Sequence, residues 1–223
     1  MPEVPDVGAF LLGAPKCGTT WLAEVLTQHP EICVSDPKEP NIVASHKGTF
    51  GRDVSEPDWV EYAGCFNGGG LRIDCSVHAM ACPIAPSRVA NNWPNARLII
   101  CLREPVSRTV SHWNMVLDTK EDKENGADWS DFSSAWEDSR LSDDTLYGAA
   151  VARWLEHFEK DSILLIEANR MRHDASMVLE EVCNHLSISS HTFDFDSVHN
   201  ANTAADRRPM TVFGRLFRFT ASL

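Results

Sequence analysis

The stretch Gly13-Ala-Pro-Lys-Cys-Gly-Thr-Thr20 decides the fold class of this chain, because it joins an apolar run to a helical pattern. The apolar run covers Val7–Leu12 and predicts a buried strand, while Trp21-Leu-Ala-Glu-Val-Leu26 continues a helix that begins at Thr19. A strand, a glycine turn and a helix start direct several backbone N–H groups and the positive end of a helix dipole at one point. We therefore expect this loop to bind a phosphate group.

Two kinds of side chain in the loop strengthen that expectation. Lys16 adds a positive charge, and the hydroxyl groups of Thr19 and Thr20 are further donors. The residue order differs from the nucleotide-binding pattern GxxxxGK[ST], in which the lysine follows the second glycine and the next hydroxyl group holds Mg²⁺. Here Lys16 precedes Gly18, and the chain contains no Gly-Lys-Ser/Thr. The sequence thus predicts a phosphate-binding loop and no metal site.

A second polar stretch follows another apolar run, Arg97–Leu102, which also predicts a strand. It reads Arg103-Glu-Pro-Val-Ser-Arg-Thr-Val-Ser111-His-Trp, and its proline suits the first turn of a helix, where a backbone N–H has no partner. Arg103 at the strand end and Ser111 about two turns into the helix are expected to converge on one anion. Helical spacing places four apolar side chains on one face, which we expect to be the core face: Val106, Val110, Trp113 and Leu117.

Strands and helices alternate along most of the chain. Further elements are expected at Glu31–Ser35 (extended), Leu71–Cys75 and Ser162–Glu167 (strands), and Pro83–Trp93, Tyr147–Phe158 and Ala175–Leu186 (helices). The acidic stretch Asp118–Asp144 reads as a solvated loop with a short helix near Asp131–Asp138. This order predicts one α/β domain over residues 1–223, of the P-loop type, with a mostly parallel sheet covered by helices on both faces.

Composition narrows the class of protein. The chain has 223 residues and a formal net charge of −12, without a basic run, so we expect no nucleic-acid partner. No apolar run is long enough to span a bilayer, and the first residues lack the basic region of a signal peptide. The seven cysteines are scattered without CxxC pairs, which favours a cytoplasmic protein with reduced thiols.

Both polar stretches resemble motifs of the sulfotransferases that use 3′-phosphoadenosine 5′-phosphosulfate (PAPS) as sulfate donor. Pro15-Lys-Cys-Gly-Thr-Thr-Trp21 resembles their 5′-phosphosulfate loop, and Arg103-x-Pro-x-x-Arg-x-x-Ser-x-Trp113 resembles their 3′-phosphate motif. The resemblance extends over most of the chain and is closest in pattern to the glycosaminoglycan-type and related bacterial members. It implies sulfuryl transfer, without a metal, to a hydroxyl or amine of a small-molecule or carbohydrate acceptor.

The resemblance also implies roles for single residues. Lys16 is expected to stabilise the leaving phosphate, and Trp21 is either a platform for adenine or a packing residue. Cys17 is a reactive thiol or, more simply, a small space-filling residue. The residues expected to contact the donor are Lys16, Cys17, Gly18, Thr19, Thr20, Trp21, Arg103, Ser111 and, in a basic loop near the C-terminus, Arg207 and Arg208.

Two side chains compete for the role of general base, which takes the proton of the acceptor. Glu39 matches the catalytic glutamate of the glycosaminoglycan-type enzymes, with Lys38 beside it. His78 is the rival, in a segment that resembles the acceptor side of the family. That segment departs from the family pattern at Cys75, where a lysine is common, and at Val77, where a proline is usual.

Two other functions are compatible with a phosphate loop. A P-loop kinase would need a Mg²⁺ seat and the Gly-Lys-Ser/Thr order. A non-catalytic nucleotide-binding module would keep both anion motifs but lack a base and an acceptor cleft. The sequence carries no pattern that specifies the acceptor or the oligomeric state.

Overall fold

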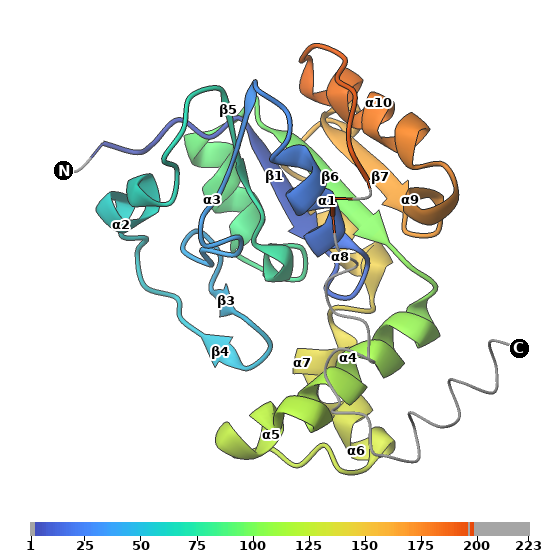
Figure 1. Ribbon diagram of the computed structural model, residues 1–223. Helices are drawn as coiled ribbons and strands as arrows, with labels where there is room; N and C mark the ends of the chain where they lie inside the picture. Colours follow the sequence, from blue (N-terminus) through green and yellow to red (C-terminus); the bar gives the residue numbers. More distant parts are fainter. Residues whose placement is uncertain (1–2, 196, 199–223) are drawn as a thin grey trace, which may run out of the picture.

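The computed structural model describes residues 3–195 and 197–198, and it is built on a five-stranded sheet in the order β2-β5-β1-β6-β7 (Figure 1). The pairings between these strands are parallel. The strands are β1 (Ala9–Gly13), β2 (Ile32–Val34), β5 (Leu71–Asp74), β6 (Arg97–Leu102) and β7 (Ile163–Glu167). The predicted α/β fold with a parallel sheet is confirmed.

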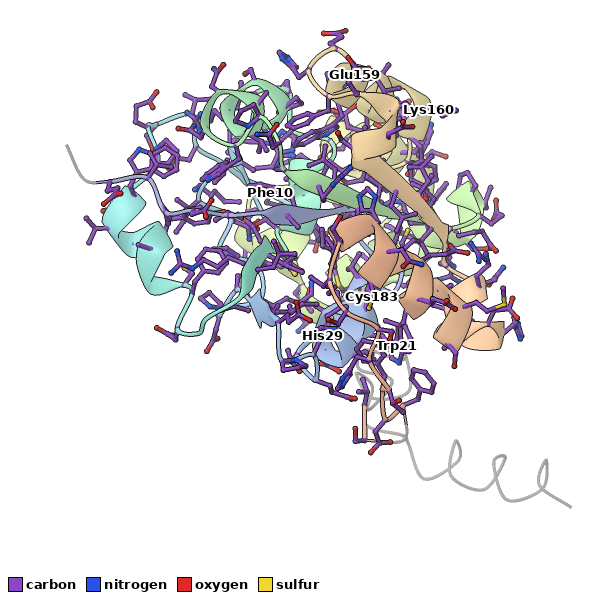
Figure 2. The ribbon with its side chains drawn as sticks, turned by 90° about the horizontal axis from the view of Figure 1, so that it is seen from above. Phe10, Trp21, His29, Glu159, Lys160 and Cys183 are labelled. Carbon is purple, nitrogen blue, oxygen red and sulfur yellow. The ribbon has the colours of Figure 1, made fainter. Side chains whose placement is uncertain are left out.

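Strand β1 lies at the centre of the sheet and is buried along its whole length. Its residues are continuously apolar because helices cover both faces of a parallel sheet. Figure 2 shows this from above: Trp21 of α1 (Thr19–Leu26) and Cys183 of α10 (Ala175–Leu186) lie on one side of the sheet, and Glu159 and Lys160 lie on the other. Phe10 of β1 lies in the layer between them.

Shorter elements complete the described part of the chain. An antiparallel hairpin pairs β3 (His46–Lys47) with β4 (Gly51–Arg52). The other helices around the sheet are α2 (Trp59–Gly64), α3 (Ala85–Asn92), α8 (Tyr147–Leu155) and α9 (Arg170–His173), with 3₁₀ turns η1 (Val77–Ala79) and η2 (Lys160–Ser162). Within the described residues, no helix is long and apolar enough to cross a bilayer.

The stretch expected to be a solvated acidic loop is instead folded, so that prediction was wrong. Beyond α4 (Pro105–Thr119) it forms α5 (Glu121–Glu124), α6 (Phe132–Glu137) and α7 (Ser139–Ser142), at the edge of the molecule to which the arrows of β1 and β6 point (Figure 1). Only the short helix near Asp131 was foreseen. The reason is a second hydrophobic cluster around Trp129, made of Phe50, Val116, Trp129, Ala135 and Leu141. Its polar edge is satisfied by carboxylates, because Asp122 accepts from the Trp129 backbone N–H and Asp138 from the indole N–H, each at 3.0 Å.

The buried face of α4 is also different from the predicted one. Val106 and Val110 are 67% and 37% exposed, although helical spacing had placed them on a core face. The fully or nearly fully buried residues of α4 are Arg108, Thr109, His112 and Val116, which recur at helical spacing on another face. Polar side chains occupy this face because buried partners from other elements satisfy them. Trp113 and Leu117 are half-buried against the Trp129 cluster.

We predict that Trp129→Ala lowers the free energy of unfolding by about 3–5 kcal/mol, because the substitution leaves a cavity and removes the indole N–H that donates to Asp138. Trp136→Ala is the matched control, since Trp136 is 39% exposed, and it should cost less than about 1 kcal/mol. Urea unfolding of the two variants measures the difference. Equal losses would mean that the cluster adds nothing to the stability of the fold.

Candidate functional site

The predicted phosphate loop lies between β1 and α1, at the carboxyl end of the central strand. Gly18 begins the helix with φ 85°, and a Cβ atom at this position would lie 2.8 Å from Met171 Cε. Gly13 has φ 138°, and a Cβ atom there would lie 2.4 Å from the Val77 carbonyl oxygen. Both glycines are therefore required by backbone conformation and by close approach of neighbouring atoms.

The start of α1 is suited to an anion. The residue before this helix is Gly18, which has no side chain, so no capping side chain accepts a hydrogen bond from the N–H groups of the first turn. Thr19 is buried at the helix start, and the Lys16 amine lies 3.5 Å from Met115 Sδ of α4. Backbone donors, a hydroxyl group and a lysine thus lie within one short loop, and together they are the donor set that a phosphate requires.

Cys17 is fully buried within this loop, with Sγ 3.9 Å from the Tyr147 hydroxyl group. Burial raises the pKa of its thiol, and this effect outweighs the opposing influence of Tyr147 and of two arginines. The thiol is therefore protonated at neutral pH, and the space-filling role is the one that the structure favours.

Trp21 is partly buried and packs against the main core, with its ring 6.2 Å from that of Phe195. This supports a packing role for Trp21. Arg207 and Arg208, the two arginines predicted to close the 3′-phosphate site, lie outside the described residues.

The second predicted anion motif begins at the end of β6, the neighbour of β1 in the sheet. Tyr147 donates to the Arg103 carbonyl oxygen at 3.0 Å and so fixes the backbone there. Glu104 caps α4 by accepting from the N–H groups of Val106 and Ser107, at 2.9 and 2.7 Å. Arg103 and Ser111 are both partly exposed. The two motifs therefore share one edge of the sheet, where ligands of open parallel sheets bind.

Glu39 and Lys38 form an ion pair, with Nζ and Oε1 2.7 Å apart. Their loop is held at the same edge, because Ser35 donates to the Lys38 carbonyl at 2.7 Å and the Asn41 N–H donates to Ser76 Oγ at 2.9 Å. Glu39 remains 32% exposed on its side chain. A carboxylate in this position is accessible to a ligand and paired with a cation.

His78 lies on η1, directly after β5, and its side chain is only 9% exposed. It belongs to a polar cluster of four buried residues, which we call the α4 cluster: His78, Arg108, His112 and Asp144. Asp144 Oδ2 lies 3.4 Å from His78 Nδ1, 3.7 Å from His112 Nδ1 and 4.0 Å from Arg108 Nη1. The sequence reasoning missed this cluster; the signal was the recurrence of polar residues 108, 109 and 112 at helical spacing.

Hydrogen bonds within the α4 cluster define the state of His112. Arg108 Nη1 donates to His112 Nδ1 at 3.0 Å, and a guanidinium cannot accept. His112 Nδ1 is therefore the acceptor, and Nε2 carries the proton that it donates to Thr49 Oγ1 at 2.9 Å. Burial lowers the pKa of His112 to about 3, which agrees with a neutral ring. For Asp144, burial acts to raise the pKa, but His78, His112 and Arg108 lower it below its ordinary value.

Two surface hollows lie away from these residues. One, of about 570 Å³, is lined by Asn95, Arg97 and residues 155–160, at the amino ends of β6 and β7. The other lies beside Gly8 and Gly70–Arg72, at the amino ends of β1 and β5. The chemistry-bearing residues are at the opposite edge of the sheet, so we place the candidate site there. No group of three or more His, Cys, Asp or Glu residues in the described part of the chain could hold a metal ion.

Comparison with known proteins adds an independent finding. A family model described as a sulfotransferase domain matches residues 6–207. The mouse heparan sulfate glucosamine 3-O-sulfotransferase 3A1 is 25% identical over 192 residues, covering 81% of this chain and 45% of that protein. The Caenorhabditis elegans bifunctional heparan sulfate N-deacetylase/N-sulfotransferase 1 is 24% identical over 201 residues, covering 86% of this chain and 23% of that protein. The chain thus spans less than half the length of these relatives.

Solved structures resemble the whole described fold. A sulfotransferase from Alicyclobacillus acidocaldarius has a TM-score of 0.71 at 22% identity, covering 98% of this chain and 93% of that chain. Mouse sulfotransferase SULT7A1, solved in complex with PAP, has a TM-score of 0.56 at 18% identity, covering 92% of this chain and 69% of that chain. At these identities the likeness shows a shared fold.

Because His112 is buried and neutral, we predict that the folded protein loses stability in acid. His112 has an ordinary pKa of 6.5 and a folded pKa of about 3, so the unfolded chain binds the extra proton and stability is lost as pH falls below 6.5. Between pH 7 and pH 5 this one residue should account for about 2 kcal/mol of lost stability. Urea unfolding of His112→Gln should show a correspondingly smaller loss than the wild type. His157→Gln, at an exposed position, is the control, and an unchanged loss in His112→Gln would contradict the prediction.

Proposed function

Because this chain belongs to the sulfotransferase family, we propose that it transfers a sulfuryl group from PAPS to a hydroxyl or amine of a small-molecule or carbohydrate acceptor. One observation supports the proposal: the two stretches predicted to bind anions follow the neighbouring parallel strands β1 and β6, at one edge of the sheet. A donor with a phosphate at each end of an adenosine fits two such sites. Family membership alone does not specify that donor.

The loop residues would hold the 5′ end of the donor. The N–H groups at the start of α1, with Thr19 and Thr20, bind the 5′-phosphate. Arg103 and Ser111 bind the 3′-phosphate, a group that ATP lacks, and so provide selectivity. The donor supplies the sulfuryl group and a phosphate as leaving group.

Lys16 is the proposed catalytic cation. Sulfuryl transfer resembles phosphoryl transfer in that positioning and charge stabilisation supply most of the catalysis. The Lys16 amine lies between the phosphate loop and α4, which carries the 3′-phosphate motif. A cation in that place stabilises negative charge that develops on the leaving phosphate.

Glu39 is the proposed general base, and His78 is the alternative. Glu39 is the more exposed of the two and follows Lys38 in a loop that is fixed to Ser76. His78 follows Ser76 by two residues, so both groups flank the same strand end. Because both side chains lie near the same strand end, their roles are separated by substituting each of them in turn.

The proposed acceptor is a carbohydrate or a small molecule, and the proposed compartment is the cytoplasm. The relatives named for heparan sulfate support a carbohydrate acceptor. All seven cysteines are free thiols, which supports a reducing compartment such as the cytoplasm.

We predict that adenosine 3′,5′-bisphosphate (PAP) binds without a metal and at least about 100-fold more tightly than ATP, because one lost charge-assisted contact costs several kcal/mol. Isothermal titration calorimetry in the presence of EDTA or of Mg²⁺ measures the affinity for both ligands. Equal affinities, or a strict need for Mg²⁺, would favour a kinase.

Lys16→Ala should abolish the SO₃ mass gain of acceptors incubated with PAPS, while Lys120→Ala, at an exposed position, should not.

We predict that Glu39→Gln lowers turnover at least about 100-fold and leaves PAP affinity within about twofold, because it removes a proton acceptor and keeps the side-chain shape. Glu56→Gln is the control, since Glu56 is exposed on the same segment. Full activity of Glu39→Gln together with an inactive His78→Gln would assign the base to His78 instead.

A further inference from the structure

The carboxylate of Asp144 is buried in the α4 cluster without a hydrogen bond that satisfies its Oδ2 atom. Its side chain is 4% exposed, and it lies in the connection between α7 and α8. An isolated buried carboxylate is costly, so its retention requires a partner of opposite charge or a strong donor. Three nitrogen atoms lie within 4.0 Å of Oδ2, one each from His78, His112 and Arg108.

Two of these nitrogen atoms are already committed. His112 Nδ1 accepts a hydrogen bond from Arg108, so it has no proton to give to Asp144. Arg108 directs Nη1 to His112 and Nη2 to the Leu141 carbonyl, both at 3.0 Å, and its Nη1 atom stays 4.0 Å from Asp144. That distance is beyond hydrogen-bond range.

His78 Nδ1 is the remaining donor, at 3.4 Å from Asp144 Oδ2. The separation is long for a hydrogen bond. A proton on Nδ1 leaves Nε2 of the neutral ring as an acceptor. Among the described residues, no group donates to His78 Nε2.

We infer that Asp144 is a positioning residue: its buried carboxylate holds His78 as the Nδ1–H tautomer, so that Nε2 accepts a hydrogen bond from the acceptor substrate. The inference rests on the proposed function, because it assumes that the acceptor lies at the strand edge shared by β1, β5 and β6. η1 is bound to that edge through the Met80 N–H, which donates to the Leu12 carbonyl at 2.9 Å. His78 therefore sits beside the phosphate loop on a fixed backbone.

The tautomer can be measured without any acceptor. Long-range proton–nitrogen correlation NMR on wild-type protein labelled with ¹⁵N-histidine distinguishes the two ring forms, and the His78→Gln spectrum assigns the signals of His78. We expect His78 to carry its proton on Nδ1. A proton on Nε2 would overturn the inference, and the tautomer itself is read from the wild-type spectrum.

Kinetics with desulfated heparan sulfate as the probe acceptor test the role in transfer. Asp144→Asn keeps the shape and removes the charge, and we expect at least a tenfold loss of kcat/KM for the acceptor with PAP affinity unchanged within about twofold. The double variant Asp144→Asn/His78→Gln should be no worse than His78→Gln alone, because Asp144 acts through His78. Asp143→Asn, a substitution of the exposed neighbour, is the matched control and should retain full activity.

The outcomes separate the inference from the proposed function. Unchanged kcat/KM in Asp144→Asn, or a further loss of at least tenfold when it is added to His78→Gln, would overturn the inference while sulfuryl transfer stands. A wild-type protein that neither binds PAP nor sulfates any acceptor would instead overturn the proposed function, and the tautomer would still decide whether Asp144 holds His78.

Discussion

The parallel pairing of β1 with β6 is the constraint on which the rest of the site depends. Register places Leu11 opposite Ile99 and Gly13 opposite Ile100, with a register shift between these pairs. The Ala14 N–H then donates to the Cys101 carbonyl at 2.8 Å, so the phosphate loop starts on the backbone of its neighbour. Because both strands end at the same edge, the loop after one and the helix after the other have a fixed separation. That separation, as much as any one side chain, would select the proposed donor, which carries a phosphate at each end of its adenosine.

The buried polar face of α4 is the second organising feature. The Arg108 guanidinium of this helix donates hydrogen bonds to His112 and to the Leu141 carbonyl, and the nearby Asp144 carboxylate supplies the compensating negative charge. Such a cluster is expensive unless its members satisfy one another. It nevertheless ties α4 to η1 and to the start of α8, which are separate in sequence. The cluster thus links the expected donor side with the expected acceptor side through contacts between buried side chains.

Much of the fold was predictable because local patterns and tertiary structure agree. The continuous apolar runs of β1 and β6 are typical of strands that are buried on both faces. The glycine turn at Gly18 is typical of a tight turn that begins a helix. The face of α4 was not predictable, because Val106 and Val110 satisfy helical periodicity as well as Arg108 and His112 do. Partners that are distant in sequence, among them Thr49, Leu141 and Asp144, make the polar face the buried one. The positions of Lys38 and Glu39 at the strand edge follow from Ser35 and Ser76, whose hydroxyl groups carry no recognisable pattern.

Two consecutive residues between β3 and β4 anchor this hairpin to α4 and to the hydrophobic cluster around Trp129. Thr49 is hydrogen-bonded to His112 of α4, and the ring of Phe50 packs at a tilt against that of Trp129, with 4.9 Å between the ring centroids, in the second hydrophobic cluster. The hairpin is thereby packed onto α4, the helix that carries Ser111, which we propose to bind the 3′-phosphate of the donor. A substitution that displaces this hairpin therefore also weakens the packing of α4, even though the two elements are more than 50 residues apart in the sequence.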